Sequence, residues 1–393
     1  MIIEIKGVEF ENKGSHLMLL AIIRQIRLWW PSAEFALTHS AKASPEQRIT
    51  AAKFRKLNLR KNYIDISRLS YFFPSVLRRF LKSLGLVTES DVDMIIDASG
   101  FSYSDQWQPK LRIYHLKNEL TRFYLYSKPY IFLPQAFGPF TDKISQRRIT
   151  NSFKYAALIC ARERESLAHI QDLTGPLECL HEYNDFTNLT EGVIPGALDR
   201  GKMWACIVPN NNMIKSQNVN KTWIKRYESI LAEAVSYYRE KGLIPFFLNH
   251  EGKKDAELID RVNSYFDDPV PVVDGLHPLL VKGLIGASEA VFSSRYHGCV
   301  SALSQGIACI GTSWSHKYEL LYRQYDATDL LLGPTTSEQK LRLAIDASLE
   351  KDSSIGRSIE VNAIGLKNRS GVMWSHFKIV AERYATFRGE REL

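Results

Sequence analysis

Two hydrophobic patterns follow one another along this chain. Short apolar runs rich in valine, isoleucine and phenylalanine recur between longer runs whose apolar residues repeat every three or four positions. The first pattern is typical of buried strands and the second of amphipathic helices, so their succession predicts parallel sheets covered by helices. The expected strands are residues 2–8, 34–37, 94–97, 130–134, 156–161, 204–209, 244–248, 270–273, 290–293 and 307–311. The expected helices are residues 15–30, 111–126, 221–241, 254–265, 278–285 and 299–304.

One stretch, residues 187–202, is rich in turn formers and lacks either pattern, and we interpret it as a linker. A chain of 393 residues is too long to fold around one ordinary hydrophobic core. We therefore expect an α/β fold of two doubly wound parallel-sheet domains facing a cleft, residues 1–186 and 203–357, followed by a helical tail, 358–393. Ligands of such sheets lie at the carboxyl ends of the strands, which makes the cleft the expected active site.

The composition, 45% hydrophobic and 24% charged, excludes disordered and fibrous classes. No apolar run is long enough to span a membrane, and the five cysteines are scattered, so we expect a cytoplasmic protein with buried free thiols. Residues 1–85 hold seven Lys and eight Arg against five Glu and one Asp, a net charge of +9. That excess suits an anionic partner such as a phosphate, a membrane or a nucleic acid.

The most informative segment runs from an expected strand into an expected helix and places Arg295, Tyr296, His297 and Gly298 on the turn between them. Arginine beside a helix start favours an anion site, the histidine can donate a proton there, and Gly298 allows a ligand close to the backbone. The alternative is a surface arginine and a histidine whose hydrogen bonds are satisfied within the fold.

Two more cations follow expected strands. Lys317 comes six residues after the strand 307–311 and could face the same cleft as His297, although a lone lysine more often lies exposed. Arg162 lies at the carboxyl end of the strand 156–161, where Glu163 and Glu165 suit the first turn of a helix.

Two loops of the first domain combine polar and aromatic residues. Asp97, Asp105 and Trp107 follow one strand, and Gln135 follows another. Carboxylates and a flat aromatic ring are what a sugar needs, whereas the alternative is an ordinary loop whose Asp97 caps a helix.

Five segments in this order resemble the polysaccharide pyruvyl transferase family: residues 12–15, 97–107, 133–140, 161–166 and 294–298 with Lys317. The Arg-Tyr-His-Gly and Leu-Pro-Gln-x-x-Gly-Pro-Phe stretches are the most specific. The resemblance implies a two-domain fold like that of the GT-B glycosyltransferases without a metal or other cofactor, and transfer of pyruvate from phosphoenolpyruvate to a sugar. It maps the functional arginine, histidine and lysine onto Arg162, His297 and Lys317. Ser15 and His16 stand where many members carry an acidic residue.

On this hypothesis Arg162, Arg295 and Lys317 bind phosphoenolpyruvate, with Tyr296 and Gly298 beside them. His297 protonates the methylene carbon of the donor. The carboxylate that accepts the hydroxyl protons is Asp97 or Asp105. The acceptor residues expected are Asn12, Ser15, Trp107 and Gln135.

Two other functions fit the same patterns. A GT-B glycosyltransferase would use the same cations on the diphosphate of a nucleotide sugar, since fold alone does not decide function. A module that binds nucleic acid or anionic membrane would use the basic first segment, although the sequence carries no nucleic-acid-binding signature.

The segment 69–87 places aromatic and aliphatic residues beside Arg78, Arg79 and Lys82. Pro74 would start a helix, with apolar residues on one face. We expect this segment to make a transient contact with the inner face of an anionic membrane, where family resemblance implies a lipid-linked acceptor. The alternative, the commoner arrangement, is that the apolar face packs on its own domain.

Overall fold

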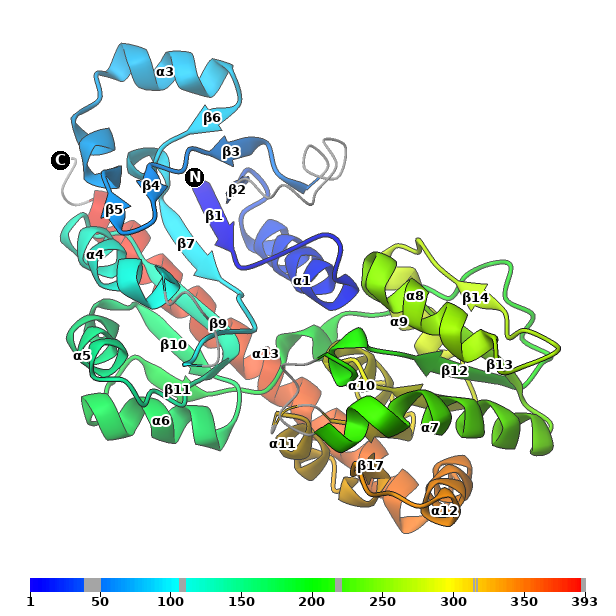
Figure 1. Cartoon of the computed structure of the whole chain (residues 1–393). Coiled ribbons are helices and arrows are strands. Elements are labelled where there is room, and N and C mark those ends of the chain that lie inside the picture. The colour runs from blue at the N-terminus through cyan, green and yellow to red at the C-terminus, as the bar shows by residue number, and fades with distance from the viewer. Residues whose placement is uncertain (39–50, 106–110, 216–220, 314, 316, 390–393) are drawn as a thin grey trace. The chain divides into compact units, whose positions relative to one another are not determined.

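The computed structural model describes residues 1–38, 51–105, 111–215, 221–313, 315 and 317–389, with side chains described as far as residue 384. The chain forms two compact units (Figure 1). Unit 1 comprises Met1–Phe10, Met18–Phe186 and Arg369–Leu393, and unit 2 comprises Glu11–Leu17 and Thr187–Asn368. The second segment of unit 1 ends at Phe186, but residues 187–202, interpreted as a linker, belong to unit 2. Glu11–Leu17 and residues 358–368 also belong to unit 2, and the remainder of the expected tail belongs to unit 1.

Within the described residues, unit 1 carries a nine-stranded sheet in the order β11-β10-β9-β7-β1-β2-β3-β6, with β8 added beside β9, and every pairing in it is parallel. The chain winds outward from β1 in both directions, so the strand order reverses between β1 and β7. The strands are β1 Ile2–Lys6, β2 Glu34–Thr38, β3 Phe54–Lys56, β6 Leu86–Val87, β7 Met94–Asp97, β8 Phe101–Tyr103, β9 Tyr130–Phe137, β10 Leu158–Ala161 and β11 Leu180–Glu182. A separate antiparallel pair joins β4, Arg60–Lys61, to β5, Ile64–Asp65.

Both faces of the unit 1 sheet are covered. Alternate residues of β9 show this, because Ile131 and Leu133 pack in one cluster with α1 and α13, whereas Tyr130 and Phe132 pack in the other with α4, α5 and α6. A strand covered on both faces is mostly apolar, which is why residues 130–134 of β9 form a continuous apolar run. These helices are α1 Lys13–Trp29, α4 Leu111–Leu125, α5 Lys143–Ser152, α6 Arg164–Thr174 and α13 Ser354–Gly389.

Unit 2 has a parallel six-stranded sheet in the order β14-β13-β12-β15-β16-β17 over the described residues. Numbered within the unit this is 3-2-1-4-5-6, the doubly wound order whose switch point lies between β12 and β15. The strands are β12 Trp204–Val208, β13 Ile244–Leu248, β14 Val272–Val273, β15 Ala290–Ser293, β16 Cys309–Thr312 and β17 Leu331–Leu332.

The helices of unit 2 also divide between the two faces of their sheet. Helices α7, α8 and α12 pack on one face, and α9, α10, α11 and the first part of α13 pack on the other. Their bounds are α7 Lys221–Glu240, α8 Gly252–Asn263, α9 Pro278–Gly286, α10 Tyr296–Leu303, α11 Lys317–Gln324 and α12 Glu338–Leu349. Two doubly wound parallel sheets confirm the expected α/β architecture.

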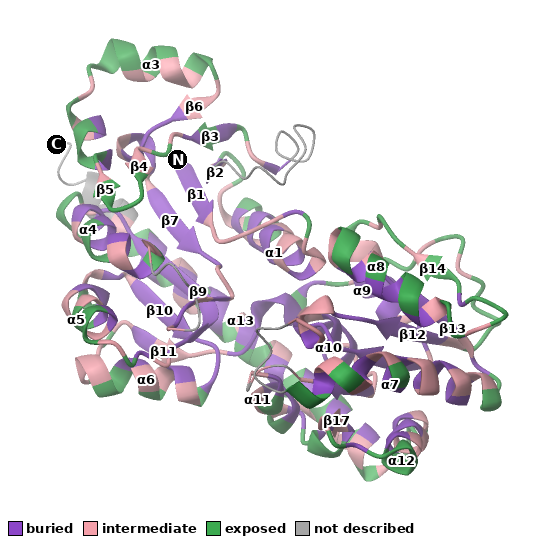
Figure 2. Ribbon diagram, viewed as in Figure 1, coloured by how far each residue is buried: buried purple, intermediate pink, exposed green. Residues whose placement is uncertain are grey.

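One helix departs from this scheme. Helix α3, Ser75–Ser83, begins after Pro74 as expected, but no residue of it is buried (Figure 2). The alternative in which its apolar face packs on its own domain is therefore wrong. Among the described residues no helix is both long and apolar enough to cross a bilayer.

Candidate functional site

The turn between β15 and α10 brings the expected donor residues of unit 2 together. Arg295 precedes the first turn of α10 in an extended conformation, so Tyr296 and His297 begin the helix. The preceding Ser294 is fixed from two sides, because its carbonyl accepts from Asn210 Nδ2 at 2.8 Å and from the Tyr318 hydroxyl at 2.9 Å. This turn lies at the switch point of the unit 2 sheet, where ligands of such sheets bind.

Gly298 is needed for a reason that the sequence did not reveal. A Cβ atom at this position would lie 2.3 Å from Ser293 Oγ, and that hydroxyl in turn donates to the Arg295 carbonyl at 3.0 Å. The Ser293 side chain therefore occupies the space that a side chain at position 298 would need. This contact requires glycine here, and the expected close approach of a ligand to the backbone does not explain it.

Two carboxylates hold the Arg295 guanidinium. Both oxygens of Asp255 accept from Nη2 at 2.5 Å, and Glu251 accepts from Nη1. Burial lowers the pKa of Arg295 to about 10 and raises the pKa of Asp255 to about 7. The contact of Arg295 with both Asp255 oxygens works in the opposite direction, because it favours the charged forms of the two groups. Arg295 is thus a fixed, buried cation, and Glu251 is the more exposed of its partners, with 28% of its side chain exposed.

A loop from the chain's first residues completes this cluster. Asn12 Nδ2 donates to Glu251 at 3.1 Å, while Asn12 Oδ1 accepts from the backbone of Gly14 and Ser15 as a helix N-cap does. A Cβ atom on Gly14 would lie 2.3 Å from the His297 ring, so only glycine allows the loop to pack there. Asn12 and Ser15, expected to bind acceptor, therefore belong to the loop that packs against His297.

Histidines next to this loop are held neutral. Burial, Arg295, His297 and Lys13 hold the pKa of His250 well below its usual range. Burial, His277 and Lys13 lower the pKa of His16 to about 4. Lys13 contributes to both shifts and Arg295 to that of His250, so cations close to this loop add to the effect of burial, and such cations favour an anion.

Lys317 begins α11, next to this cluster. Its Nζ lies 5.2 Å from the centroid of the Tyr296 ring and 5.7 Å from that of Tyr318. The Tyr296 ring in turn contacts the His297 ring edge-on at 5.4 Å between centroids. The structure therefore brings Lys317 beside the Arg295–His297 turn, as the sequence predicted from two successive strand ends.

The remaining expected donor residue, Arg162, lies in unit 1. It follows β10 directly, is 3% exposed, and forms ion pairs with Glu163 at 3.5 Å and Asp185 at 3.7 Å. Its backbone N–H donates to the Gln135 carbonyl at 3.1 Å. Its expected role on the donor stays a prediction.

Asp97 has a structural environment that argues against its expected role as base. Its Oδ2 accepts from the hydroxyls of Tyr103 at 2.6 Å and Tyr130 at 3.0 Å. Its Oδ1 accepts from the N–H and hydroxyl of Ser99 and, at 3.5 Å, from Gln135. These donors occupy the lone pairs with which a carboxylate would accept a substrate proton.

Asp105 is likewise engaged, since its Oδ2 accepts from the backbone and hydroxyl of Thr141 and from the backbone of Asp142. It anchors the loop that leads into α5. Trp107, expected to bind acceptor, lies outside the described residues.

Unit 1 contains a cavity of about 500 Å³ that sequence reasoning missed. It lies at the carboxyl ends of β1, β2, β3 and β7, which is the switch point of that sheet. Its polar lining comprises Glu4, Lys6, Glu9, Thr38, Lys56, Asn58, Arg60, Asn62, Ser67, Asp97, Ser99, Tyr103, Arg112, His115 and Glu119. Lys6 lies in the expected strand 2–8 and ends β1, whereas Lys56 ends β3, a strand that was not expected from the sequence.

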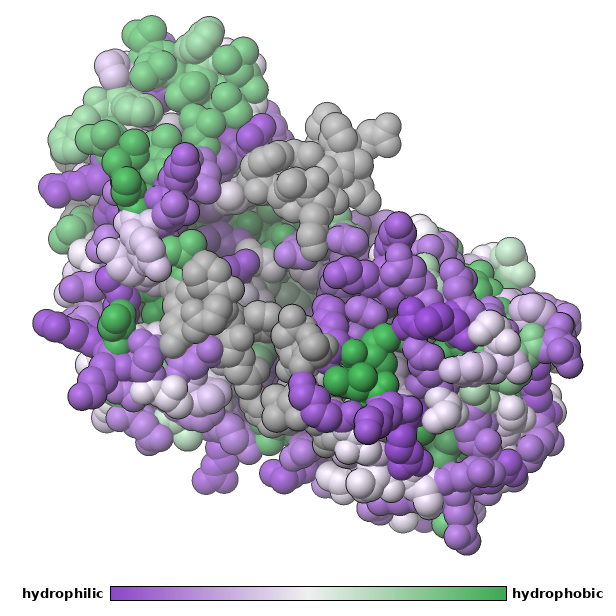
Figure 3. Space-filling model, in the orientation of Figure 1, coloured by the Kyte–Doolittle hydropathy of each residue, from purple (hydrophilic) through white to green (hydrophobic). Residues whose placement is uncertain are grey.

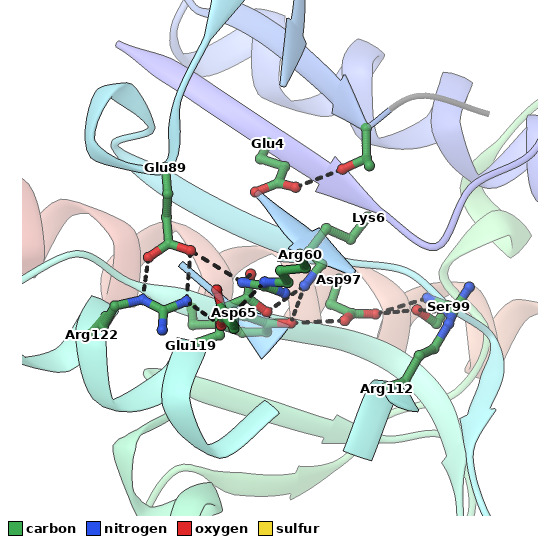
Figure 4. Close-up of polar contacts among 12 residues, drawn as sticks. Glu4, Lys6, Arg60, Asp65, Glu89, Asp97, Ser99, Arg112, Glu119 and Arg122 are labelled. Carbon is green, nitrogen blue, oxygen red and sulfur yellow. Dashed lines mark hydrogen bonds and ion pairs between the residues drawn. The ribbon is translucent and has the colours of Figure 1, made fainter. Parts of the chain in front are cut away.

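The charges around this cavity are matched within the protein (Figure 4). Buried Glu119 accepts from Lys6 at 2.5 Å and from Arg60 at 2.7 Å, and Lys56 binds Glu4. Burial would raise the pKa of Glu119, but Arg60, Lys6 and Lys56 outweigh it and hold that pKa well below the usual range. Much of the basic charge of residues 1–85 is therefore used internally.

Arg112 and His115 also line this cavity, and they contact hydroxyl and carbonyl oxygens. Arg112 donates from Nη1 to the hydroxyls of Ser99 at 3.1 Å and Ser102 at 2.8 Å (Figure 4). His115 Nε2 lies 2.5 Å from the Asn62 carbonyl. Across the described residues, no group of three or more His, Cys, Asp or Glu side chains could hold a metal ion.

Solved structures with the same fold come from other enzymes. UDP-GlcNAc 2-epimerase from Neisseria meningitidis, solved with UDP-GlcNAc, is 11% identical with a TM-score of 0.57 and covers 96% of this chain and 99% of its own. MnaA from S. aureus, solved with UDP, is 12% identical with a TM-score of 0.56 and covers 96% of each chain. Trehalose-6-phosphate synthase OtsA is 10% identical with a TM-score of 0.51, covering 99% of this chain and 98% of its own. At this identity they establish the GT-B-like fold alone.

No curated protein sequence matches the chain. The family of polysaccharide pyruvyl transferases, however, matches residues 12–316, a span that includes the Asn12 loop, Arg162, Asp255 and the Arg295–His297 turn. This chain belongs to the polysaccharide pyruvyl transferase family.

Proposed function

We propose that this protein transfers pyruvate from phosphoenolpyruvate to two hydroxyls of one sugar, forming a cyclic ketal and releasing inorganic phosphate. The observation that carries the proposal is the grouping of Arg295, His297 and Lys317 at the carboxyl ends of β15 and β16. A histidine among cations suits a donor that has both a phosphate and a carboxylate and that must be protonated. No metal or organic cofactor is needed in this proposal.

Lys317 would neutralise the phosphate of the donor. Arg295 would bind an anionic group of the donor by exchanging one of its two carboxylates. Because Asp255 is fully buried and Glu251 is partly exposed, the donor would displace Glu251 while Asp255 keeps the guanidinium in place.

The reaction begins when protonated His297 gives its proton to the methylene carbon, which becomes a methyl group and leaves C2 electron-poor. The oxygen of one sugar hydroxyl bonds to C2, and the proton of that hydroxyl returns to His297. The second hydroxyl then bonds to C2 as the bond from C2 to the phosphate oxygen breaks. Its proton leaves with the phosphate, so atoms and charge balance.

We propose further that the cavity of unit 1 binds the sugar. Its volume of about 500 Å³ falls within the range of small-molecule sites, and its polar lining offers both donors and acceptors for hydroxyls. Asn12, Ser15 and Gln135, the residues expected to bind acceptor, are not among those that line it. The acceptor would be a lipid-linked precursor of an exopolysaccharide or capsule.

The decisive experiment incubates the protein with phosphoenolpyruvate and a panel of lipid-linked sugars, and measures phosphate release and the mass of each sugar. We expect phosphate together with a sugar that has gained a pyruvate ketal. Release of nucleotide from a UDP-sugar, with phosphoenolpyruvate left intact, would instead identify a glycosyltransferase.

A second experiment tests the donor site alone. Glu251→Gln keeps the shape of the side chain and its contact with Asn12 but removes the charge that competes for Arg295. We expect phosphoenolpyruvate to bind several-fold more tightly to this variant, measured by calorimetry. A matched change of an exposed carboxylate on the same unit, Glu257→Gln, should leave binding unchanged. Weaker binding to Glu251→Gln would contradict the proposed exchange.

A further inference from the structure

Helix α3 exposes an apolar face that belongs to no core of the described residues. Val76 is 68% exposed and Phe80 is 59% exposed, and the preceding Phe72 is 70% exposed. The α3 surface, as we define it, consists of Leu69, Phe72, Val76, Leu77, Phe80 and Leu84, all of them exposed. Hydrophobic side chains gather over this helix in Figure 3. Large contiguous apolar patches of this kind mark interaction sites.

The helix faces its own unit with its polar side. Arg78 and Lys82 lie on one side of the helix and reach the buried Asp91 at 3.9 Å and 3.3 Å. At 100° per residue, Val76 and Phe80 lie on the opposite side. A helix of a globular protein normally buries its apolar side, so α3 has the reverse orientation.

Cations surround the α3 surface and acidic residues do not. Residues 66–88 contain Arg68, Arg78, Arg79 and Lys82 but no Asp or Glu. Arg68 and Arg79 are exposed. The flanking acids are already bound, because Asp65 and Glu89 both form ion pairs with Arg60 and Arg122. The partner must therefore be both apolar and negatively charged at its surface.

A second copy of the chain does not meet these conditions. A twofold contact places the same surface patch of each copy against the other. Here it would bring Arg68 and Arg79 of each copy toward cations of the other with no acid in residues 66–88 to offset them, and such juxtaposition is unfavourable.

We propose that unit 1 binds the surface of an anionic lipid bilayer through the α3 surface. The apolar side chains enter the boundary between headgroups and acyl chains, and the arginines remain among the headgroups. This binding does not depend on the chemistry of the donor. It deepens the proposed function only in that a lipid-linked acceptor would be met at the same bilayer.

The test is co-sedimentation of the full chain with vesicles of phosphatidylcholine, with and without phosphatidylglycerol, at low and high salt. We expect partitioning into the anionic vesicles that weakens in high salt. The apolar variant Val76→Ser with Phe80→Ser should lower the partition coefficient on anionic vesicles at least about tenfold. The charge variant Arg68→Gln with Arg79→Gln should lower it about 25-fold, because each cation contributes about fivefold near an anionic surface.

The matched control changes Val361 and Ile364 to Ser, since both are exposed on α13 outside the α3 surface. It should partition like the wild type. The proposal is overturned if the wild type does not bind anionic vesicles at low salt, or if both α3 variants bind as well as the wild type. It is equally overturned if light scattering shows a dimer that the Val76→Ser with Phe80→Ser variant dissociates, because the surface would then join two copies of the chain.

Discussion

The two sheets place charged residues at the same topological position, but the two sites differ in how those charges are balanced. In unit 1, Lys6, Lys56 and Arg60 are each bound by a buried glutamate. In unit 2, Arg295 is bound by Asp255 and by the partly exposed Glu251, Lys317 lies beside the Tyr296 ring, and histidines nearby are held neutral.

This difference indicates two classes of ligand. A cavity whose charges cancel has polar hydrogen-bonding groups without a net field, which suits an uncharged sugar. A turn where Arg295, His297 and Lys317 lie close together attracts an anion, which suits phosphoenolpyruvate. The pKa directions agree with this reading, because in unit 1 cations lower the pKa of Glu119 against the effect of burial, whereas in unit 2 burial and then Arg295 lower the pKa of His250.

The largest expected effect comes from His297. His297→Ala should reduce turnover at saturating phosphoenolpyruvate by about 10²- to 10⁴-fold, because it removes the proposed acid. His181→Ala, which changes a histidine of unit 1, should leave turnover unchanged and serves as control. Near-normal turnover of the His297→Ala variant, with an unaltered melting temperature, would remove the acid from the mechanism.

The second prediction concerns the ion pairs that balance the charges in unit 1. Glu119→Gln should lower the free energy of unfolding by about 3–5 kcal/mol, because buried Lys56 and half-buried Lys6 and Arg60 would lose their shared partner. Glu338→Gln removes an exposed ion pair with Arg342 and should cost less than about 1 kcal/mol. Both values can be measured by urea denaturation. Equal costs in the two variants would show that the charges of unit 1 are not coupled as described.

Most of the fold could be predicted from the sequence because strands buried on both faces stand out as apolar runs. Strands β7, β13 and β15 have the predicted bounds. The short strands β3, β6 and β17 were not predicted, since two or three residues are too few to show a hydrophobic period. The orientation of α3 also escaped, because an amphipathic pattern does not say which side faces the protein.

The candidate site was predictable where strand ends carry distinctive residues, as at Arg295, His297 and Lys317. The residues that hold Arg295 in place could not be predicted, because Asp255 lies inside α8 and contacts Arg295 only through the tertiary fold. The role of Asp97 was misjudged for the same reason, since its partners Tyr103 and Tyr130 come from different strands.

The third prediction concerns pH and the neutral histidines of unit 2. Because the folded state holds the pKa of His250 below its unfolded value near 6.5, the unfolded state takes up the proton first as the pH falls. The wild type should therefore lose about 2 kcal/mol of unfolding free energy from this group between about pH 7 and pH 5. His250→Gln should remove this contribution to the change of unfolding free energy with pH. Parallel stability curves for the two proteins would show that His250 takes up its proton in the folded state as well.

The fourth prediction concerns the guanidinium of Arg295, which has several N–H donors. Arg295→Lys should raise the KM for phosphoenolpyruvate about tenfold, because lysine cannot bind Asp255 and the donor at once. Asp255→Asn loosens the guanidinium without removing it and should raise KM less. If the two variants raise KM equally, donor binding depends on where Asp255 holds the positive charge of residue 295, and not on the ability of the guanidinium to bind Asp255 and the donor at once.

The smallest expected effect is that of chelation. The donor's negative charges must be neutralised before its methylene carbon can accept a proton, and a metal ion or protein cations can do this. In unit 2 the carboxylates of Glu251 and Asp255 are bound to Arg295, while Lys317 and Arg295 supply positive charge directly. Turnover should therefore be the same in EDTA and in added Mg²⁺. If EDTA abolished phosphate release and Mg²⁺ restored it, Glu251 and Asp255 would have to be reassigned from partners of Arg295 to ligands of a metal, and the comparison between the two sites would fail.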